Sequence, residues 1–317
     1  MIAATTFGID GPVLSARERD FHRQAQPWGF ILFKRNVESP DQLRRLTSEL
    51  RDCVGREAPI LIDQEGGRVD RLGPPHWPTH VPPLDEAAGA PLPVRAAALK
   101  DRYRRIASDL RATGIDVNCA PALDIAYPDT HPFLRNRCYG ETAEDVAVLG
   151  RAVADGLMEG GVLPVMKHMP GHGRGRVDSH HDLPRTDAPR PVLEAEDFAP
   201  FRALSDLPMG MTAHMVFEDI DPTVPATASP KMVQTVREQI GFDGLLMTDD
   251  IGMNALSGTV EERVATGLAA GCDLILHCNG DIDERERVAA VVPALAGRAA
   301  VRADAALALR PRETAHA

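Results

Sequence analysis

Residues 161–168 are Gly161-Val162-Leu163-Pro164-Val165-Met166-Lys167-His168, an apolar run that ends in two polar side chains. A run this short and this apolar is typical of a strand that is buried on both faces, as in a parallel sheet. The loop that follows is rich in glycine, histidine and arginine, and the next helix is expected near Pro191. Long loops in compact domains are usually functional or disordered, and the many titratable groups in this one favour a functional role.

Runs of the same kind recur along the whole chain and alternate with segments whose apolar residues have helical spacing. Helix-end signals support several of these segments, for example the Ser229-Pro230 pair at a helix start and Gly271 just past a helix end. The expected strands are residues 3–9, 29–33, 59–62, 115–120, 162–166, 209–213, 244–247 and 273–276, and the clearest expected helices are residues 40–54, 96–113, 143–159, 231–240 and 260–270.

Eight strands that alternate with helices predict an α/β fold, a (β/α)8 barrel of the TIM type. The alternative that this pattern leaves open is a doubly wound open sheet. Because no linker or low-complexity segment interrupts the pattern, we expect one catalytic domain over residues 1–317, with a frayed tail from about residue 310.

Composition excludes several classes of function. The net charge of -11 over 317 residues argues against a general binder of nucleic acids or anionic membranes. No apolar run is long enough to cross a bilayer, and the N-terminus lacks the pattern of a secretion signal. The five cysteines are odd in number and include no C-x-x-C pair, which is typical of a reducing compartment. We therefore expect a cytoplasmic protein, and a monomer.

Polar residues follow the expected strands at the points where the strands end. In a barrel of this type, catalytic groups lie at the carboxyl ends of the strands. The sequence therefore predicts one polar rim, which contains Asp63 and Arg71 after the third strand, Arg137 after the fourth, Lys167 and His168 after the fifth, and Asp249 after the seventh.

Asp249 follows a strand that is apolar enough to be buried on both faces. A carboxylate at such a strand end suits a nucleophile or a metal ligand, and the alternative is a helix N-cap supplied by Asp249 or Asp250. Asp178 and His180 are two residues apart, so their side chains can meet in an extended stretch and form a proton-transferring pair. The alternative for this pair is an ordinary polar surface loop.

Arg71 and Arg137 supply bidentate donors for an oxygen-rich ligand, and Asp63 can accept bonds from hydroxyl groups. An internal salt-bridge network is the alternative for any one of these residues. The histidines at positions 168, 172, 180 and 181 do not have the spacing of a zinc site, and the sequence contains no nucleotide-binding loop and no G-x-S-x-G motif. We therefore expect no metal and no cofactor.

Together these segments resemble the family 3 glycoside hydrolases, in particular the β-N-acetylhexosaminidases of bacterial cell-wall recycling. The resemblance runs in family order from about residue 7 to about residue 280, and its most specific part is the string at residues 167–173 followed by Asp178-Ser179-His180. Arg174-Gly175-Arg176 departs from the family pattern, which has a more acidic or small-residue loop there. The other matching stretches are residues 63–71, 118–124, 211–214 and 241–250.

The resemblance implies a role for each matching position. Asp249 looks like the nucleophile, and His180 looks like the general acid/base with Asp178 as its partner. The implied sugar-binding residues are Asp63, Arg71, Arg137, Lys167 and His168. The implied reaction is hydrolysis of terminal N-acetylglucosamine from anhydro-muramyl saccharides, with retained configuration through a covalent glycosyl-enzyme. Alternatives are a phosphorylase of the same family, a sugar-binding barrel without activity and, third, a metal-dependent hydrolase.

Overall fold

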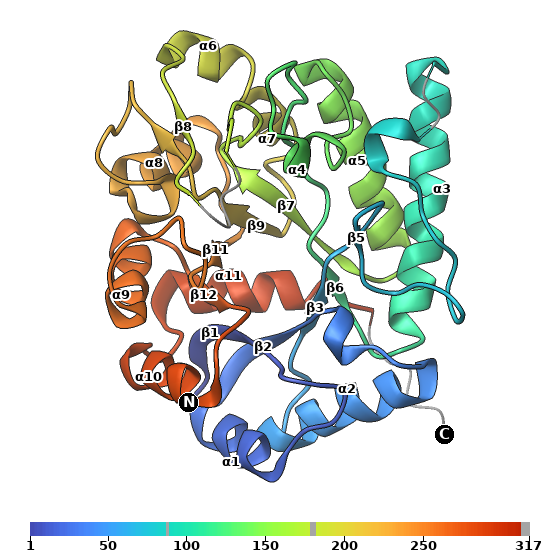
Figure 1. Ribbon diagram of the computed structural model, residues 1–317, viewed down its shortest axis with the longest axis vertical. Coiled ribbons are helices and arrows are strands. Elements are labelled where there is room, and N and C mark those ends of the chain that lie inside the picture. Colours follow the sequence, from blue (N-terminus) through green and yellow to red (C-terminus); the bar gives the residue numbers. More distant parts are fainter. Residues whose placement is uncertain (87–88, 178–181, 312–317) are drawn as a thin grey trace.

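The computed structural model describes residues 1–86, 89–177 and 182–311. Within these residues eight parallel strands close into a barrel, with helices around it (Figure 1). The order around the barrel is β1-β12-β11-β9-β7-β6-β3-β2, so the last strand pairs with the first. The barrel strands are β1 Ala3–Gly8, β2 Pro27–Leu32, β3 Ile60–Ile62, β6 Val117–Asn118, β7 Leu163–Met169, β9 Met209–Thr212, β11 Leu245–Asp250 and β12 Leu274–His277.

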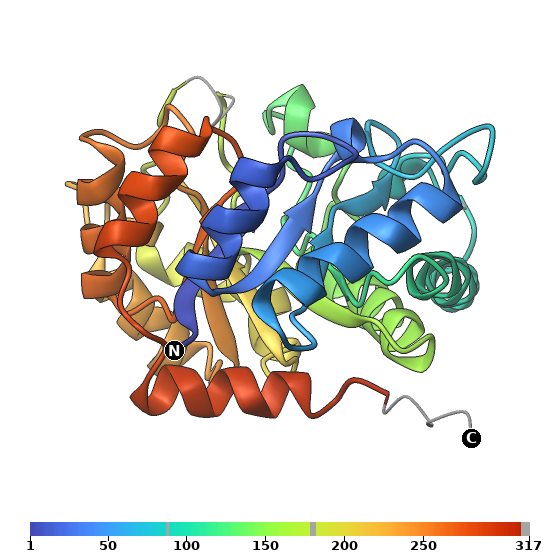
Figure 2. The same ribbon diagram turned by 90° about the horizontal axis from the view of Figure 1, so that it is seen from below.

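Helices follow the strands along the chain and cover the outside of the barrel (Figures 1 and 2). The last helix, α11, lies across the end of the barrel near the N-terminus (Figure 2). Its Ala303 and Ala306 are buried in the same cluster as inward-facing strand residues. The helices are α1 Ala16–Ala25, α2 Pro40–Val54, α3 Leu92–Arg111, α4 Pro132–Arg135, α5 Ala143–Glu159, α6 Arg190–Ala195, α7 Ala199–Ala203, α8 Pro230–Gln234, α9 Val260–Ala270, α10 Ile282–Val291 and α11 Gly297–Leu307.

Short elements complete the described structure. An antiparallel pair, β4 with β5, follows β3 directly, and β8 pairs with β10 beyond β7 and β9. A π-helical turn, η4, continues α8. These elements are β4 Gln64–Gly66, β5 Val69–Asp70, β8 Arg185–Thr186, β10 Val216–Phe217, the π-helical η4 Thr235–Gln239 and the 3-10 turns η1 Lys34–Asn36, η2 Pro83–Asp85 and η3 Ala226–Ala228.

The inside of the barrel is filled by apolar side chains, as is usual for this architecture. Leu61, Val165 and Met247 belong to one buried cluster in the barrel interior. Because successive side chains of a strand point to opposite faces, the residues two positions further along share that inward direction. Those residues are Asp63, Lys167 and Asp249, so the inward face changes from apolar to charged at the carboxyl ends of β3, β7 and β11.

The predicted closed barrel is confirmed, and the doubly wound sheet is excluded because β1 pairs with both β2 and β12. The predicted helix at residues 231–240 is present as α8 and its π-helical continuation, with Ser229 as N-cap. The strand expected at residues 115–120 is shorter, since only Val117 and Asn118 pair with both neighbouring strands; one further bridge joins Ala122 to Lys167.

At residue 310, where the sequence predicts the start of a frayed tail, the chain is still anchored. Arg310 is held in place, since its guanidinium bonds to Asp116 at 2.7 Å and to the carbonyl of Glu57 at 3.1 Å. Residues 312–317 lie outside the described residues. Among the helices of the described chain, none combines the length and the apolar character that crossing a membrane requires.

Candidate active site

A pocket opens at the carboxyl ends of the barrel strands. It contains six of the eight predicted site residues, which come from four different strand ends or the loops that follow them. Asp178 and His180, the other two, lie outside the described residues. The lining residues are Ile31, Phe33, Asp63, Arg68, Val69, Arg71, Phe133, Leu134, Arg137, Lys167, His168, His172, Met211, Asp249, Asp250, Met253, Leu276, Cys278 and Asn279.

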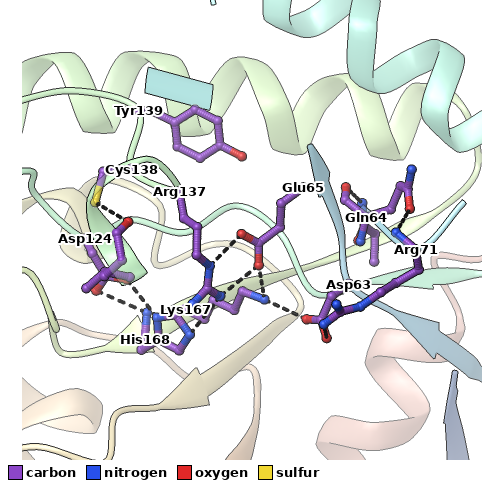
Figure 3. Close-up of polar contacts among 12 residues, drawn as sticks. Asp63, Gln64, Glu65, Arg71, Asp124, Arg137, Cys138, Tyr139, Lys167 and His168 are labelled. Atoms are coloured by element: carbon purple, nitrogen blue, oxygen red, sulfur yellow. Dashed lines mark hydrogen bonds and ion pairs between the residues drawn. The ribbon is translucent and has the colours of Figure 1, made fainter. Parts of the chain in front are cut away.

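A buried carboxylate, Glu65, organises the positive charges of this pocket (Figure 3). Arg137 donates to both of its oxygens, at 2.8 and 2.9 Å, and the ammonium of Lys167 lies 2.6 Å from one of them. The Glu65 side chain is 1% exposed and that of Lys167 is 2% exposed. Burial alone would raise the pKa of Glu65, but Arg137 and Lys167 outweigh it and hold this pKa at about 2.

The backbone of Glu65 is fixed as firmly as its side chain. Its carbonyl accepts bonds from the Tyr103 hydroxyl at 2.8 Å and from Arg102 at 2.9 Å. Tyr103 in turn contacts the hydroxyl of Tyr139 at 2.8 Å, and all of these side chains are buried. Helix α3 therefore positions Glu65 from outside the barrel.

Asp63 carries the network to the pocket surface. Lys167 donates to one of its oxygens at 2.7 Å, and Arg71 lies 3.4 Å from the other (Figure 3). Burial would raise the pKa of Asp63, but Lys167 and Arg71 outweigh it and hold this pKa well below its ordinary value. Lys167 has three N–H groups, of which two serve Asp63 and Glu65, so one remains for a ligand.

His168 is oriented by Asp124, which is fully buried. The His168 Nδ1 lies 2.7 Å from Asp124, and Nε2 lies 3.4 Å from an N–H-bearing nitrogen of Arg137. Since arginine only donates, this arrangement suits an imidazole with its proton on Nδ1 and an acceptor on Nε2. The other Asp124 oxygen accepts the backbone N–H of His172 at 2.6 Å, so one carboxylate positions both the end of β7 and the loop that follows it.

Asp249 is the penultimate residue of β11 and is partly open to the pocket. One of its oxygens accepts the backbone N–H of Asp250 at 2.8 Å. Burial would raise the pKa of Asp249, but His214, His168, this N–H group and Lys167 together hold it below the ordinary value. The carboxylate is therefore ionised at neutral pH and faces a cavity, which is what a nucleophile requires.

Asp250 has the structural role that the sequence left open for one of the two aspartates. Its carboxylate accepts the backbone N–H groups of Gly252 and Cys278, both at 2.9 Å, and the Asn279 amide at 3.2 Å. Its carbonyl accepts from His214 Nε2 at 2.9 Å. These bonds join the ends of β11 and β12 and fix the backbone on which Asp249 sits.

The sequence assigned no role to Glu65, Asp124 or His214. A usable signal existed for Glu65, because it lies two residues after Asp63 among polar residues that follow a buried strand. Asp124 and His214 also follow strands closely, but nothing in their spacing identifies their partners, which include His168 for Asp124 and the Asp250 carbonyl for His214. Among the described residues, no group of three or more His, Cys, Asp or Glu side chains has an arrangement that could hold a metal ion.

Comparisons with known proteins agree with this geometry. Residues 15–307 match the model of the glycosyl hydrolase family 3 N terminal domain. The chain is 37% identical to a protein of Alkalilimnicola ehrlichii named Beta-hexosaminidase, over 88% of this chain and 81% of that one. It is also 37% identical to the Beta-hexosaminidase of Methylococcus capsulatus, over 93% and 87% of the two chains.

Solved structures give the same result. NagZ from Neisseria gonorrhoeae in complex with N-trifluoroacetyl-D-glucosamine has a TM-score of 0.87 and 30% identity, over 97% of this chain and 90% of that chain. A glycoside hydrolase family 3 beta-N-acetylglucosaminidase from Paenibacillus sp. has a TM-score of 0.86 and 33% identity over 96% of this chain. The present chain spans 60% of that Paenibacillus protein.

The first prediction concerns Glu65→Gln. Because the folded-state pKa of Glu65 lies near 2, its charge stabilises the folded state above the unfolded pKa of about 4.3 and loses this effect as the pH falls towards 2. We expect the variant to lower the free energy of unfolding at pH 7 by about 3 kcal/mol, since Arg137 is left without its buried partner. Urea denaturation at pH 7, 5 and 3 measures this, and the difference from the parent protein should shrink at the lowest pH.

Glu57→Gln is the matched control. The Glu57 side chain is 75% exposed and pairs with Arg51 at 3.1 Å, so its loss should change the free energy of unfolding by less than about 1 kcal/mol. Equal effects of the two variants, or a Glu65→Gln effect that does not vary with pH, would contradict the assigned role of Glu65.

Proposed function

The chain belongs to glycosyl hydrolase family 3 and is a glycoside hydrolase, and on that premise we propose that it is a retaining β-N-acetylhexosaminidase. The observation that carries the proposal is the ionised Asp249 at the end of β11, in the same pocket as Asp63, Arg137, Lys167 and His168. A carboxylate beside fixed donors and acceptors suits attack on a bound sugar.

The first chemical step forms a covalent intermediate. A carboxylate oxygen of Asp249 attacks the anomeric carbon, and the bond from that carbon to the leaving oxygen breaks. His180 gives its proton to the leaving oxygen and so becomes neutral. Asp178 stabilises the cationic form of His180 before transfer and fixes its orientation.

The second step reverses these roles. His180 takes a proton from water, and the resulting hydroxide attacks the anomeric carbon and displaces Asp249. Two inversions at the same carbon give a sugar with retained configuration. The roles of Asp178 and His180 rest on the family resemblance of residues 177–180.

The sugar-binding roles follow from free bonding capacity in the pocket. The Asp63 carboxylate, whose side chain is 15% exposed, can accept from hydroxyl groups. Lys167 keeps one N–H for a sugar oxygen, and Arg71 adds a further donor at the rim. His168 and Arg137 lie side by side on the same pocket wall.

The substrate is proposed to be a terminal N-acetylglucosamine attached to an anhydro-muramyl sugar or its peptide. The Beta-hexosaminidase names of the relatives and the N-trifluoroacetyl-D-glucosamine in the Neisseria structure support the glycone. The proposed leaving group is based on the family resemblance.

We also propose that the whole chain acts as one catalytic domain and as a monomer in the cytoplasm. Its five cysteines are all free and buried, which suits a reducing compartment.

A chromogenic assay with an aryl N-acetyl-β-glucosaminide and an aryl β-glucoside side by side tests the activity and the sugar. We expect hydrolysis of the glucosaminide and little of the glucoside. Phosphate is added in a parallel reaction, because a phosphorylase of the same family would form the sugar 1-phosphate. Absence of turnover with both sugars would instead favour the sugar-binding barrel, and loss of activity in chelator would favour a metal-dependent hydrolase.

Replacing the nucleophile gives the second prediction. Asp249→Ala should lower kcat/KM for the aryl glucosaminide by at least about a thousandfold, because it removes the carboxylate that forms the covalent bond. Asp20→Ala is the control, since the Asp20 side chain is 66% exposed, and it should keep the parent rate. A parent-like rate for Asp249→Ala would exclude the assignment.

Replacing the acid/base gives the third prediction. His180→Ala should lower kcat/KM much more for a poor leaving group, such as an alkyl alcohol, than for a nitrophenol, because a good leaving group departs without a proton. The slope of log kcat/KM against leaving-group pKa measures this. Equal losses across the series would argue against an acid role for His180.

A further inference from the structure

Arg174, at the departure from the family pattern, is held by three side chains. Its Nε donates to Asp197 at 2.7 Å, and one Nη donates to Glu196 at 2.6 Å and to the Tyr127 hydroxyl at 3.0 Å. The guanidinium also lies over the Tyr127 ring, 4.2 Å from its centre. The Asp197 side chain is 2% exposed, so its ion pair with Arg174 is shielded from water. We call Arg174, Asp197, Glu196 and Tyr127 the loop clamp.

The backbone around Arg174 is fixed on its other side to the connection between β6 and α4. The Gly175 carbonyl accepts the N–H of His131 at 3.0 Å, and the Gly173 carbonyl accepts from the Thr130 hydroxyl. Gly173 packs so closely that a Cβ there would lie 2.1 Å from the carbonyl oxygen of Ile125. Residues 173–175 are thus held between the β6–α4 connection and the segment before α7.

This arrangement argues against a role of Arg174 in binding anionic substrates. Its single positive charge already has two carboxylate partners, Asp197 and Glu196, so a third anion would meet net negative charge. Arg176 differs: its side chain is 74% exposed and its contact with Asp129 spans 3.5 Å. Of these two arginines, Arg174 is therefore built into the structure and Arg176 is not.

We propose that Arg174 is a positioning residue for the acid/base. It stands four residues before Asp178 and six before His180 in the sequence. The loop clamp fixes the entry of this segment, so that His180 protonates the leaving oxygen efficiently. Without the clamp, residues 173–175 are held less firmly, and proton transfer by His180 becomes less efficient. This inference rests on the proposed function.

The test compares Arg174→Ala with Arg176→Ala across a series of aryl and alkyl N-acetyl-β-glucosaminides. Arg174→Ala should lower kcat/KM by at least about tenfold for poor leaving groups, which need the proton, and by less than about threefold for nitrophenol. Arg176→Ala should change neither value. A merely destabilised enzyme would lose both activities in equal proportion, so the leaving-group dependence separates positioning from stability.

A second measurement examines the clamp itself. Amide hydrogen exchange of the peptide that covers residues 170–177 should be faster in Arg174→Ala than in Arg176→Ala and the parent protein. If Arg174→Ala does not fold, Arg174→Lys serves instead, since it keeps a charge for Asp197 but cannot span all three partners. Arg174→Lys should then show the same leaving-group dependence at smaller amplitude.

The failures of this inference and of the proposed function are distinguishable. If the parent protein lacks the activity, or His180→Ala shows no leaving-group dependence, the proposed function fails. If His180→Ala shows that dependence and the Arg174 variant loses rate equally on all substrates, or on none, the positioning role of Arg174 is overturned.

Discussion

One buried carboxylate, Glu65, makes the charged end of this barrel possible. Lysine and arginine side chains are rarely buried unless they are paired, because removing a charge from water is costly. Glu65 accepts two bonds from Arg137 and one from Lys167, and it lies in the network next to Asp63. The cations therefore stay inside the pocket with defined directions. The groups that face the pocket are consequently preorganised by the fold.

The period of two along a strand explains where the site lies. The residues that fill the barrel and the residues that line the pocket occupy the same inward face, as Leu61 and Asp63, Val165 and Lys167, and Met247 and Asp249 show. Apolar burial within the barrel closes its interior to water, and the charged groups occupy the last inward position. The apolar layer that stabilises the barrel therefore lies directly beneath the layer of charged residues that line the pocket.

Much of this could be predicted from the sequence, because apolar runs and helical spacing are local signals. They located the barrel strands and placed Asp63, Lys167 and Asp249 at the strand ends. The contacts of Glu65 and Asp124 could not be predicted, since they join residues far apart in the chain: Glu65 and Arg137 are separated by 72 positions. For the same reason Arg174 gave no sign that Asp197 would hold it. The pairing of Asp178 and His180 was suggested by their spacing of two residues, their acid/base roles came from the family resemblance, and both remain predictions.

The claim that Asp249 forms the covalent bond to the sugar is tested most directly by trapping the intermediate. A fluorinated N-acetylglucosaminyl fluoride, which forms the glycosyl-enzyme faster than water releases it, would be incubated with the parent protein and the product digested and analysed by mass spectrometry. We predict one added sugar per chain, attached to the peptide that contains Asp249. Attachment to a different residue, or an active enzyme that never carries the label, would contradict the claim.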